Sequence, residues 1–182
     1  MERKRKRSSD SNFEFTIYSF AYKNGIPQDC IYYADLRGLE NSSWKVPGYK
    51  TKTGVDKEIS EFVFNSKRSK EKYQEILTTL KEVEEFSKRK GLRSAGIGIG
   101  CKSGQHRSVA FVELLSAEAS LNIVNIKHLE QMEVQTVNRL SSFHCSICGV
   151  SPKGCNEINT HMLSKKHFKK KVKLSKRQRK SD

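Results

Sequence analysis

Two kinds of hydrophobic spacing alternate along the chain, and together they predict a domain of strands and helices. Aromatic and β-branched residues dominate 13–22, and an apolar run over 31–34 ends at Asp35, so both segments are expected to form strands. Apolar residues then recur at intervals of three and four over 55–63 and 73–86, which is typical of helices packed on a core.

A second pattern, over 94–126, predicts how the strands pair. It contains a short apolar strand over 94–100, a polar loop, a helix over 109–120 with Ser108 as its cap, and a final strand over 121–126. This βαβ order implies parallel strands, so we expect an α/β fold built on a small, mostly parallel sheet with flanking helices. Folds of this class bind ligands in the loops between the carboxyl end of a strand and the next helix.

The loop between this strand and this helix, CKSGQHRS at 101–108, has the composition of a phosphate-binding site. A helix start presents free N–H groups and a positive dipole end, Gly104 allows close approach of the backbone, and Lys102 and Arg107 add cationic donors. The same loop satisfies Cys-x5-Arg-Ser, the arrangement of cysteine-dependent phosphatases, in which Cys101 would attack phosphate and Arg107 would clamp it. A third interpretation makes Cys101 a small buried residue whose polar neighbours pair locally.

Four ordered blocks of sequence resemble the bacterial RapZ (YvcJ-type) C-terminal domain. The longest block is IGIGCKSGQHRSVAFVELL, which resembles the family's Gly-Cys-Thr-Gly-Gly-x-His-Arg-Ser loop after an apolar strand. The others are YSFAYKNGIP, YYADLRGL and KTGVD, which resemble Ser-Phe-Gly-x-Lys-x-Gly-Ile-Pro, Asp-Val-Arg-Phe-Leu and Leu-Thr-Gly-Leu-Asp. The resemblance covers residues 15–130, and four blocks in the same order are a more specific signal than the loop alone.

This resemblance implies an α/β domain that binds a phosphorylated amino sugar and structured RNA and has no catalytic activity of its own. It implies that Asp35 and Arg37 line the ligand pocket and that the loop binds the anionic group of the ligand. The loop residues are Cys101, Lys102, Ser103, Gly104, His106, Arg107 and Ser108. In the loop, Lys102 and Ser103 replace the usual Thr and Gly of the family. No Gly-x4-Gly-Lys-[Ser/Thr] motif occurs, so nucleotide hydrolysis is not expected.

The C-terminal part of the chain contains Cys145-x2-Cys148-x12-His161-x5-His167, which is the ligand pattern of a ββα C2H2 zinc finger. Two thiolates on a β knuckle and two imidazoles on a following helix would bind one structural Zn²⁺ tetrahedrally, and the metal would supply folding energy that this apolar-poor segment lacks. The six-residue step between the histidines rotates about 240° around an ideal helix, so the helix must distort to aim both imidazoles at one ion.

The long spacing and the sequence His-x-Leu-Ser-Lys-Lys-His resemble the U1-type or matrin-type zinc finger, a family associated with double-stranded or structured RNA. The resemblance makes RNA the expected partner, and a finger that binds a protein partner is the alternative. The lysines at the end of the finger and the start of the tail suit phosphate contacts, which supply affinity more than sequence discrimination. Those expected to bind nucleic acid are Lys165, Lys166, Lys169, Lys170, Lys171 and Lys173.

The composition and net charge of the chain exclude some classes of protein and favour others. The chain has 182 residues, 35% of them hydrophobic, which suits one modest core plus a small metal-stabilised module and excludes a large multidomain enzyme. No run of 18 apolar residues occurs, so a membrane partner is not expected. The formal net charge of +15 divides into +3 for 1–10, +3 for 11–140 and +9 for 141–182, which favours a polyanion partner at the carboxyl end.

We therefore expect a nonenzymatic RNA-binding or adaptor protein made of five segments. Basic residues at both ends favour a nuclear location, with a cytoplasmic one as the alternative. A cysteine-dependent phosphatase and a protein-interaction adaptor are the rival functions. The segments are a disordered basic tail over 1–12, the RapZ-like domain over 13–133, a connector over 134–142, the zinc finger over 143–172 and a basic tail over 173–182.

Overall fold

The computed structural model describes residues 13–40, 43–130, 139–140, 143–145 and 147–178. The predicted N-terminal tail, most of the predicted connector and the last four residues of the predicted C-terminal tail lie outside these residues.

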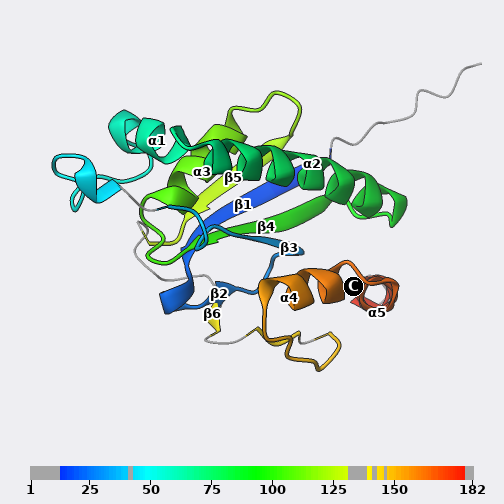
Figure 1. The fold of residues 1–182 in the computed structure, drawn as a ribbon. Helices are drawn as coiled ribbons and strands as arrows, with labels where there is room; N and C mark the ends of the chain where they lie inside the picture. Colours follow the sequence, from blue (N-terminus) through cyan, green and yellow to red (C-terminus); the bar gives the residue numbers. More distant parts are fainter. Residues whose placement is uncertain (1–12, 41–42, 131–138, 141–142, 146, 179–182) are drawn as a thin grey trace, which may run out of the picture.

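A four-stranded sheet with the strand order β3-β4-β1-β5 forms the centre of the structure (Figure 1). All neighbouring strands in it are parallel, because β1 pairs with β4 and β5, and β3 pairs with the other edge of β4. In register, Asp35 lies beside Gly100 and Ala21 beside Cys101, so the carboxyl ends of the strands meet at one edge. The strands are β1 (Glu14–Ala21), β3 (Tyr32–Asp35), β4 (Ser94–Cys101) and β5 (Ile123–His128).

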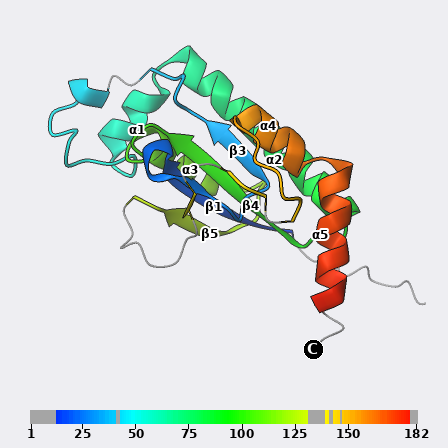
Figure 2. The ribbon, with the colours of Figure 1, turned by 90° about the horizontal axis from the view of Figure 1, so that it is seen from below.

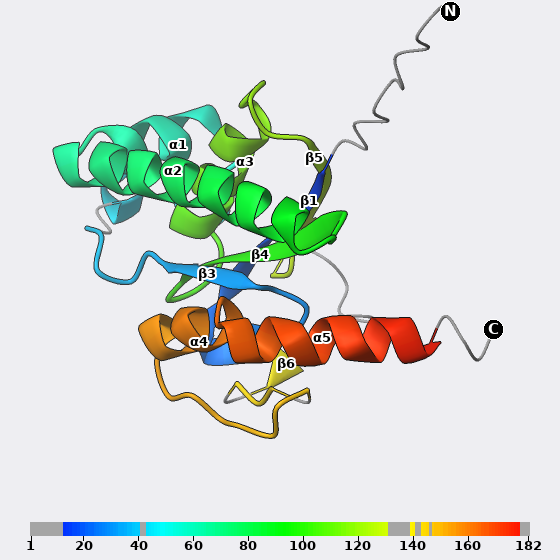
Figure 3. The same cartoon turned by 90° about the vertical axis from the view of Figure 1, so that its right-hand side faces the viewer.

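Helices lie on both sides of this sheet (Figure 3). On one side are α1 (Lys57–Phe64), α2 (Lys67–Arg89) and α3 (Arg107–Ser116). On the other side are α4 (Cys155–Met162) and α5 (Lys165–Gln178). The short elements are the antiparallel pair of β2 (Ile26–Pro27) with β6 (Arg139–Leu140), and the 3-10 helices η1 (Tyr22–Asn24) and η2 (Ser43–Lys45).

The alternation of isoleucine and glycine in β4 explains how the core is built on its two faces. Ile97 and Ile99 are fully buried. On the opposite face, a Cβ added to Gly98 would lie 2.7 Å from the Tyr33 ring, and one added to Gly100 would lie 2.4 Å from the Phe20 ring. Glycine is therefore required on this face because aromatic rings pack directly against the backbone of the central strand.

The predicted strands and helices are confirmed, with two corrections around the polar loop. Helix α3 begins at Arg107 with His106 as its cap residue, so Ser108 lies inside the first turn and does not cap the helix. The reason is that the carbonyl of His106 already accepts the N–H of Ala110, at 2.9 Å. The strands on either side of this helix are parallel as expected, but β1 lies between them and pairs with each of the two.

The C-terminal segment packs on the sheet through the outer edge of β3. The side-chain amide of Asn159, on α4, accepts the N–H of Tyr33 and donates to the carbonyl of the same residue, both at 2.8 Å. Phe143 packs edge-on against the Tyr33 ring, at 6.0 Å between centroids, and it is buried in one apolar cluster with Met162 and the residues of the sheet. One hydrophobic core therefore includes residues of the sheet and residues of the C-terminal segment.

We expect Asn159→Ala to lower the free energy of unfolding by about 2 kcal/mol, because it leaves two backbone groups of a buried residue without partners. Thr160→Ala is the matched control, since the exposed Thr160 hydroxyl bonds only to a carbonyl of its own helix. Urea unfolding of the two variants measures the difference. Equal stability of Asn159→Ala and wild type would contradict this account of how the segment is held.

Candidate functional site

The polar loop between β4 and α3 lies at the edge of the sheet where the parallel strands end. Gly104 has a φ of +71°, and a Cβ there would lie 2.3 Å from Glu130 Cγ and 2.7 Å from the backbone nitrogen of Ala21, so only glycine fits. The thiol of Cys101 accepts the Gly104 N–H at 3.2 Å and lies 3.3 Å from the Ser108 hydroxyl. Because Cys101 is only 1% exposed, its sulfur holds the loop from inside.

His106 connects the loop to the segment before α1. Its Nε2 lies 2.9 Å from the carbonyl oxygen of Tyr49 and 3.0 Å from that of Lys52, and the side chain is buried. Gly54 donates its N–H to the carbonyl of Gln105, and a Cβ on Gly54 would lie 2.3 Å from the carbonyl oxygen of His106. The contact explains why the KTGVD block accompanies the loop in the sequence.

Arg107 is turned into the protein and holds the chain after β3. Its Nη1 donates to the carbonyl of Leu36 at 3.0 Å and to that of Leu39 at 2.6 Å, and the residue is 5% exposed. Lys102 is exposed and Ser103 is half-buried. Of the two predicted cationic donors, the one that faces solvent is therefore Lys102.

Asp35 and Arg37 form an ion pair at the end of β3, with 2.7 Å between Asp35 Oδ2 and Arg37 Nη2. The guanidinium of Arg37 also lies 3.9 Å from the centroid of the Tyr22 ring. Partial burial acts to raise the pKa of Asp35, but the hydrogen bonds and charge of Arg37 outweigh burial, so this pKa is lowered. Asp35 also lines a hollow of about 280 Å³ between the end of β3 and α2, together with Arg68 and Lys72.

A chain of hydrogen bonds near this edge was not predicted. His128 Nδ1 lies 2.8 Å from the hydroxyl of Ser19, and His128 Nε2 lies 2.7 Å from a carboxylate oxygen of Glu113. The three residues belong to β5, β1 and α3. Because Ser19 is fully buried, the chain joins three elements and does not present a nucleophile. The only sequence feature that pointed to these hydrogen bonds was a serine, Ser19, inside an otherwise apolar strand.

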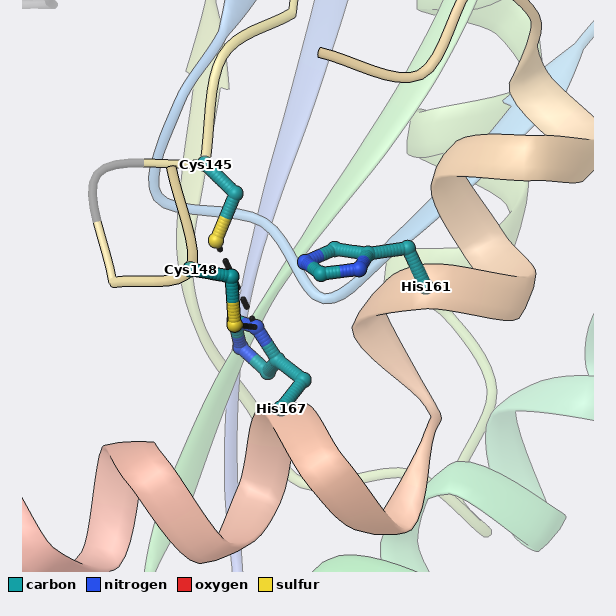
Figure 4. Close-up of side chains that lie close together, drawn as sticks. All are labelled: Cys145, Cys148, His161 and His167. Carbon is teal, nitrogen blue, oxygen red and sulfur yellow. Dashed lines mark hydrogen bonds between the residues drawn. The ribbon is translucent and has the colours of Figure 1, made fainter. Parts of the chain in front are cut away.

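The four predicted metal ligands are brought together (Figure 4). The ligand atoms of Cys145, Cys148, His161 and His167 all lie within 4.8 Å of one another. Nδ1 of His167 is 3.4 Å from the Cys145 sulfur and 3.6 Å from the Cys148 sulfur. The Nε2 atoms of both histidines are buried without a hydrogen-bond partner among the described residues. Buried polar atoms are normally paired, so this group could hold a metal ion.

The protonation state of the two histidines also suits metal binding. Burial, with the charges of nearby lysines, lowers the pKa of His161, and burial lowers the pKa of His167 to about 4. Both imidazoles are therefore neutral at pH 7, which is the form that binds metals. Burial and the neighbouring Cys145 raise the pKa of the Cys148 thiol.

Local turns position these ligands. Gly149, with a φ of +71°, closes a turn in which its N–H donates to the carbonyl of Cys145 at 2.7 Å. The hairpin expected around this knuckle is represented, among the described residues, by a single β bridge between Cys145 and Val150. The prediction of one helix after the knuckle is also wrong, because α4 ends at Met162 and a second helix follows. Ser164 begins a new helix, in which its hydroxyl accepts the N–H of His167 at 3.2 Å.

The lysines of α5 form one exposed face. Counting 100° per residue, the five exposed lysines fall within an arc of about 140°, and they extend over about 12 Å along the axis. They are Lys165, Lys166, Lys169, Lys170 and Lys173. The sixth predicted residue, Lys171, is half-buried, and burial lowers its pKa. The sequence has no acidic residue between Glu157 and Asp182, so few charges oppose this face.

A family model of the RapZ C-terminal domain matches residues 13–132. The chain belongs to the RapZ C-terminal domain family. The match includes the loop at the edge of the sheet and ends before the Cys/His group. None of the described helices is both long and apolar enough to cross a membrane.

Curated bacterial relatives agree with this assignment. A protein of Streptomyces griseus named "nucleotide-binding protein" is 38% identical over 109 residues, which are 60% of this chain and 33% of the relative. Proteins of the same name from Lacticaseibacillus casei and Lacticaseibacillus paracasei are each 35% identical over 133 residues, which are 72% of this chain and 45% of each relative. The chain thus spans less than half the length of these relatives.

Proposed function

We propose that this protein binds structured or double-stranded RNA through a zinc-stabilised C-terminal segment, and that its RapZ-type domain binds a phosphorylated ligand. The observation that carries the RNA part is the exposed lysine face of α5, beside a partly buried Cys2His2 group. Clustered lysines gain affinity for nucleic acid by releasing the counterions of its phosphates.

Zinc is the metal that this donor set favours. Two sulfurs and two imidazole nitrogens suit the tetrahedral coordination of Zn²⁺, and closed sites with four protein ligands are structural. Cys145 and Cys148 would bind as thiolates, and His161 and His167 as neutral imidazoles. The bound ion supplies folding energy to the segment, which holds α5 in position.

RNA is favoured over a protein partner because the lysine face is charged and not apolar. Lysines act as point charges, so this face supports binding to phosphates with little reading of base sequence. The spacing of the histidines, which resembles U1-type fingers, supports duplex or structured RNA as the form that is bound.

The loop at the edge of the sheet supports a second ligand, a phosphorylated amino sugar. Lys102 is exposed beside the start of α3, where N–H groups and the helix dipole favour an anion. The name of the curated relatives, "nucleotide-binding protein", also agrees with a phosphate-bearing ligand, although this chain has no Gly-x4-Gly-Lys-[Ser/Thr] motif. Phosphatase activity has less support, because the Cys101 thiol is buried and accepts the N–H of Gly104.

We expect the protein to bind one Zn²⁺ per chain, and His161→Ala to weaken this binding by roughly 100-fold or more, about 3 kcal/mol. The estimate follows from four ligands sharing the roughly 10–16 kcal/mol of a structural site. His144→Ala is the control, since His144 bonds to Ser151 and lies outside the group. Competition with a chromophoric chelator measures the affinity. Equal zinc affinity of the two variants would contradict the proposed ligand set.

We expect Lys169→Gln with Lys173→Gln to weaken binding of zinc-loaded protein to a 20-base-pair RNA duplex by about tenfold or more at 0.1 M salt. The slope of log K against log salt should fall by about two, because two phosphate contacts are lost. Fluorescence anisotropy across a salt series provides both values.

The control for this experiment is Lys70→Gln with Lys81→Gln, which removes the same charge from exposed positions of α2. A duplex of DNA and a single strand of RNA test the form of nucleic acid. If the α5 pair changes affinity no more than the α2 pair does, the lysine face is a solvated surface and the RNA proposal is wrong.

For the second ligand, we expect calorimetry to show binding of glucosamine 6-phosphate but not of glucosamine. Lys102→Ala should weaken the binding by about tenfold, which is the value of one charge-assisted hydrogen bond. Lys50→Ala, at an exposed position before the KTGVD block, is the control. Lys102 is more informative than Arg107, which also holds the chain after β3. Equal binding of glucosamine 6-phosphate and glucosamine by the wild-type protein, or binding of neither, would contradict this part of the proposal.

A further inference from the structure

The carboxyl end of α2 lies beside α5, although the two are separated by more than 70 residues in the sequence (Figure 2). Phe86 of α2 and Phe168 of α5 stack edge to face, with 4.7 Å between ring centroids. Phe168 is only 1% exposed, and at 100° per residue it leaves the helix about 60° outside the arc of the exposed lysines, next to Lys165. This contact fixes the lysine face relative to the turn that follows α2.

The end of α2 and the turn after it carry four basic residues, of which two have no acidic partner among the described residues. Lys88 pairs with Glu84, and Arg89 pairs with Glu85. Among the described residues, no ion pair involves Lys90 or Arg93, and both are exposed. Two positive charges at the end of α2 that faces α5 therefore have no acidic partner among the described residues.

The turn holds these two residues in a fixed backbone conformation. Gly91, with a φ of +73°, ends the helix, and the N–H of Leu92 donates to the carbonyl of Ser87 at 3.0 Å. The carbonyl of Arg93 accepts the N–H of Glu14 at 2.9 Å, at the start of β1. The backbone of the turn is therefore anchored at both ends.

Two distances place the Lys90 ammonium near α5. The Lys90 ammonium lies 5.6 Å from the centroid of the Phe86 ring. With the stacking distance of the two rings, this puts the ammonium no more than about 10 Å from the Phe168 ring, which comes from the same turn of α5 as Lys165 and Lys169.

We infer that Lys90 and Arg93 form, together with the exposed lysines of α5, one surface that binds the phosphates of duplex RNA. The inference rests on the proposed function and deepens it, because it makes the RapZ-type domain part of the RNA interface. A lysine face on one helix can follow a single phosphate chain. A second pair of charges on another rigid element adds phosphates that lie across the duplex, whose A-form shape is recognised through its backbones.

The plainer role of basic residues at this position is to stabilise the carboxyl end of a helix through its dipole. Lys88 and Arg89, in the last turn of α2, suit that role. Arg93 lies beyond the helix end, after Gly91, where the dipole effect has fallen off. The experiment must therefore separate stability from binding.

The test compares three double variants of the zinc-loaded chain: Lys90→Gln with Arg93→Gln, Lys169→Gln with Lys173→Gln, and the control Lys70→Gln with Lys81→Gln. The binding of each variant to a 20-base-pair RNA duplex and to a single-stranded RNA of the same length is measured across a salt series. Urea unfolding measures the stability of each variant. We expect the first pair to weaken duplex binding by about tenfold, with a salt slope lower by about two. We expect little change for single-stranded RNA and for stability.

The outcomes separate the inference from the proposed function. If the Lys90 and Arg93 variant equals the control while the α5 variant binds weakly, RNA binding stands and the composite surface is wrong. If neither variant differs from the control, both are wrong. If the first variant loses duplex and single-stranded RNA equally, the surface does not recognise a duplex and the inference is overturned. Loss of stability without loss of affinity would leave only the helix-end role.

Discussion

The position of the whole C-terminal segment depends on the outer edge of β3. A strand at the edge of a sheet exposes unpaired N–H and C=O groups, which are costly to bury and prone to pair with other chains. Here the amide of Asn159 pairs both groups of Tyr33, as a neighbouring strand would, and Phe143 covers the ring of the same tyrosine. Because α4 is fixed at this edge, the Cys/His group and α5 are placed beside the RapZ-type domain.

A second constraint comes from the spacing of the histidines. On one continuous helix, His161 and His167 would point in directions about 120° apart, so both could not face the same two sulfurs. The chain resolves this by ending one helix and starting another at Ser164, after which the two imidazole rings lie 5.0 Å apart. The break also turns α5 toward α2, where Phe168 meets Phe86. One local feature thus positions the Cys/His group and the basic helix.

Most of the sheet could be predicted from sequence, because its strands are apolar runs and a βαβ order implies that they are parallel. The position of β1 between β4 and β5 could not be predicted in this way. The four clustered ligands could also be predicted, since their spacing is specific. Contacts between distant residues could not. Nothing in the pattern around Asn159 or Phe168 shows that these side chains meet Tyr33 and Phe86, because neither contact has a local signature. The cap of α3 was misassigned for a related reason: Ser108 has the residue type of a cap, but its hydroxyl is needed beside the buried thiol of Cys101.

The basic side chains of this protein have different roles when they are buried and when they are exposed. Arg107 is buried, and its Nη1 donates to two carbonyls inside the protein. Lys102, in the loop before α3, and the exposed lysines of α5 remain in solvent as point charges. Point charges attract any phosphate, so discrimination between nucleic acids must come from their arrangement in space. That arrangement is set by apolar contacts, chiefly Phe86 with Phe168, and by the turn at Gly91, which together keep charges from two elements at a fixed separation.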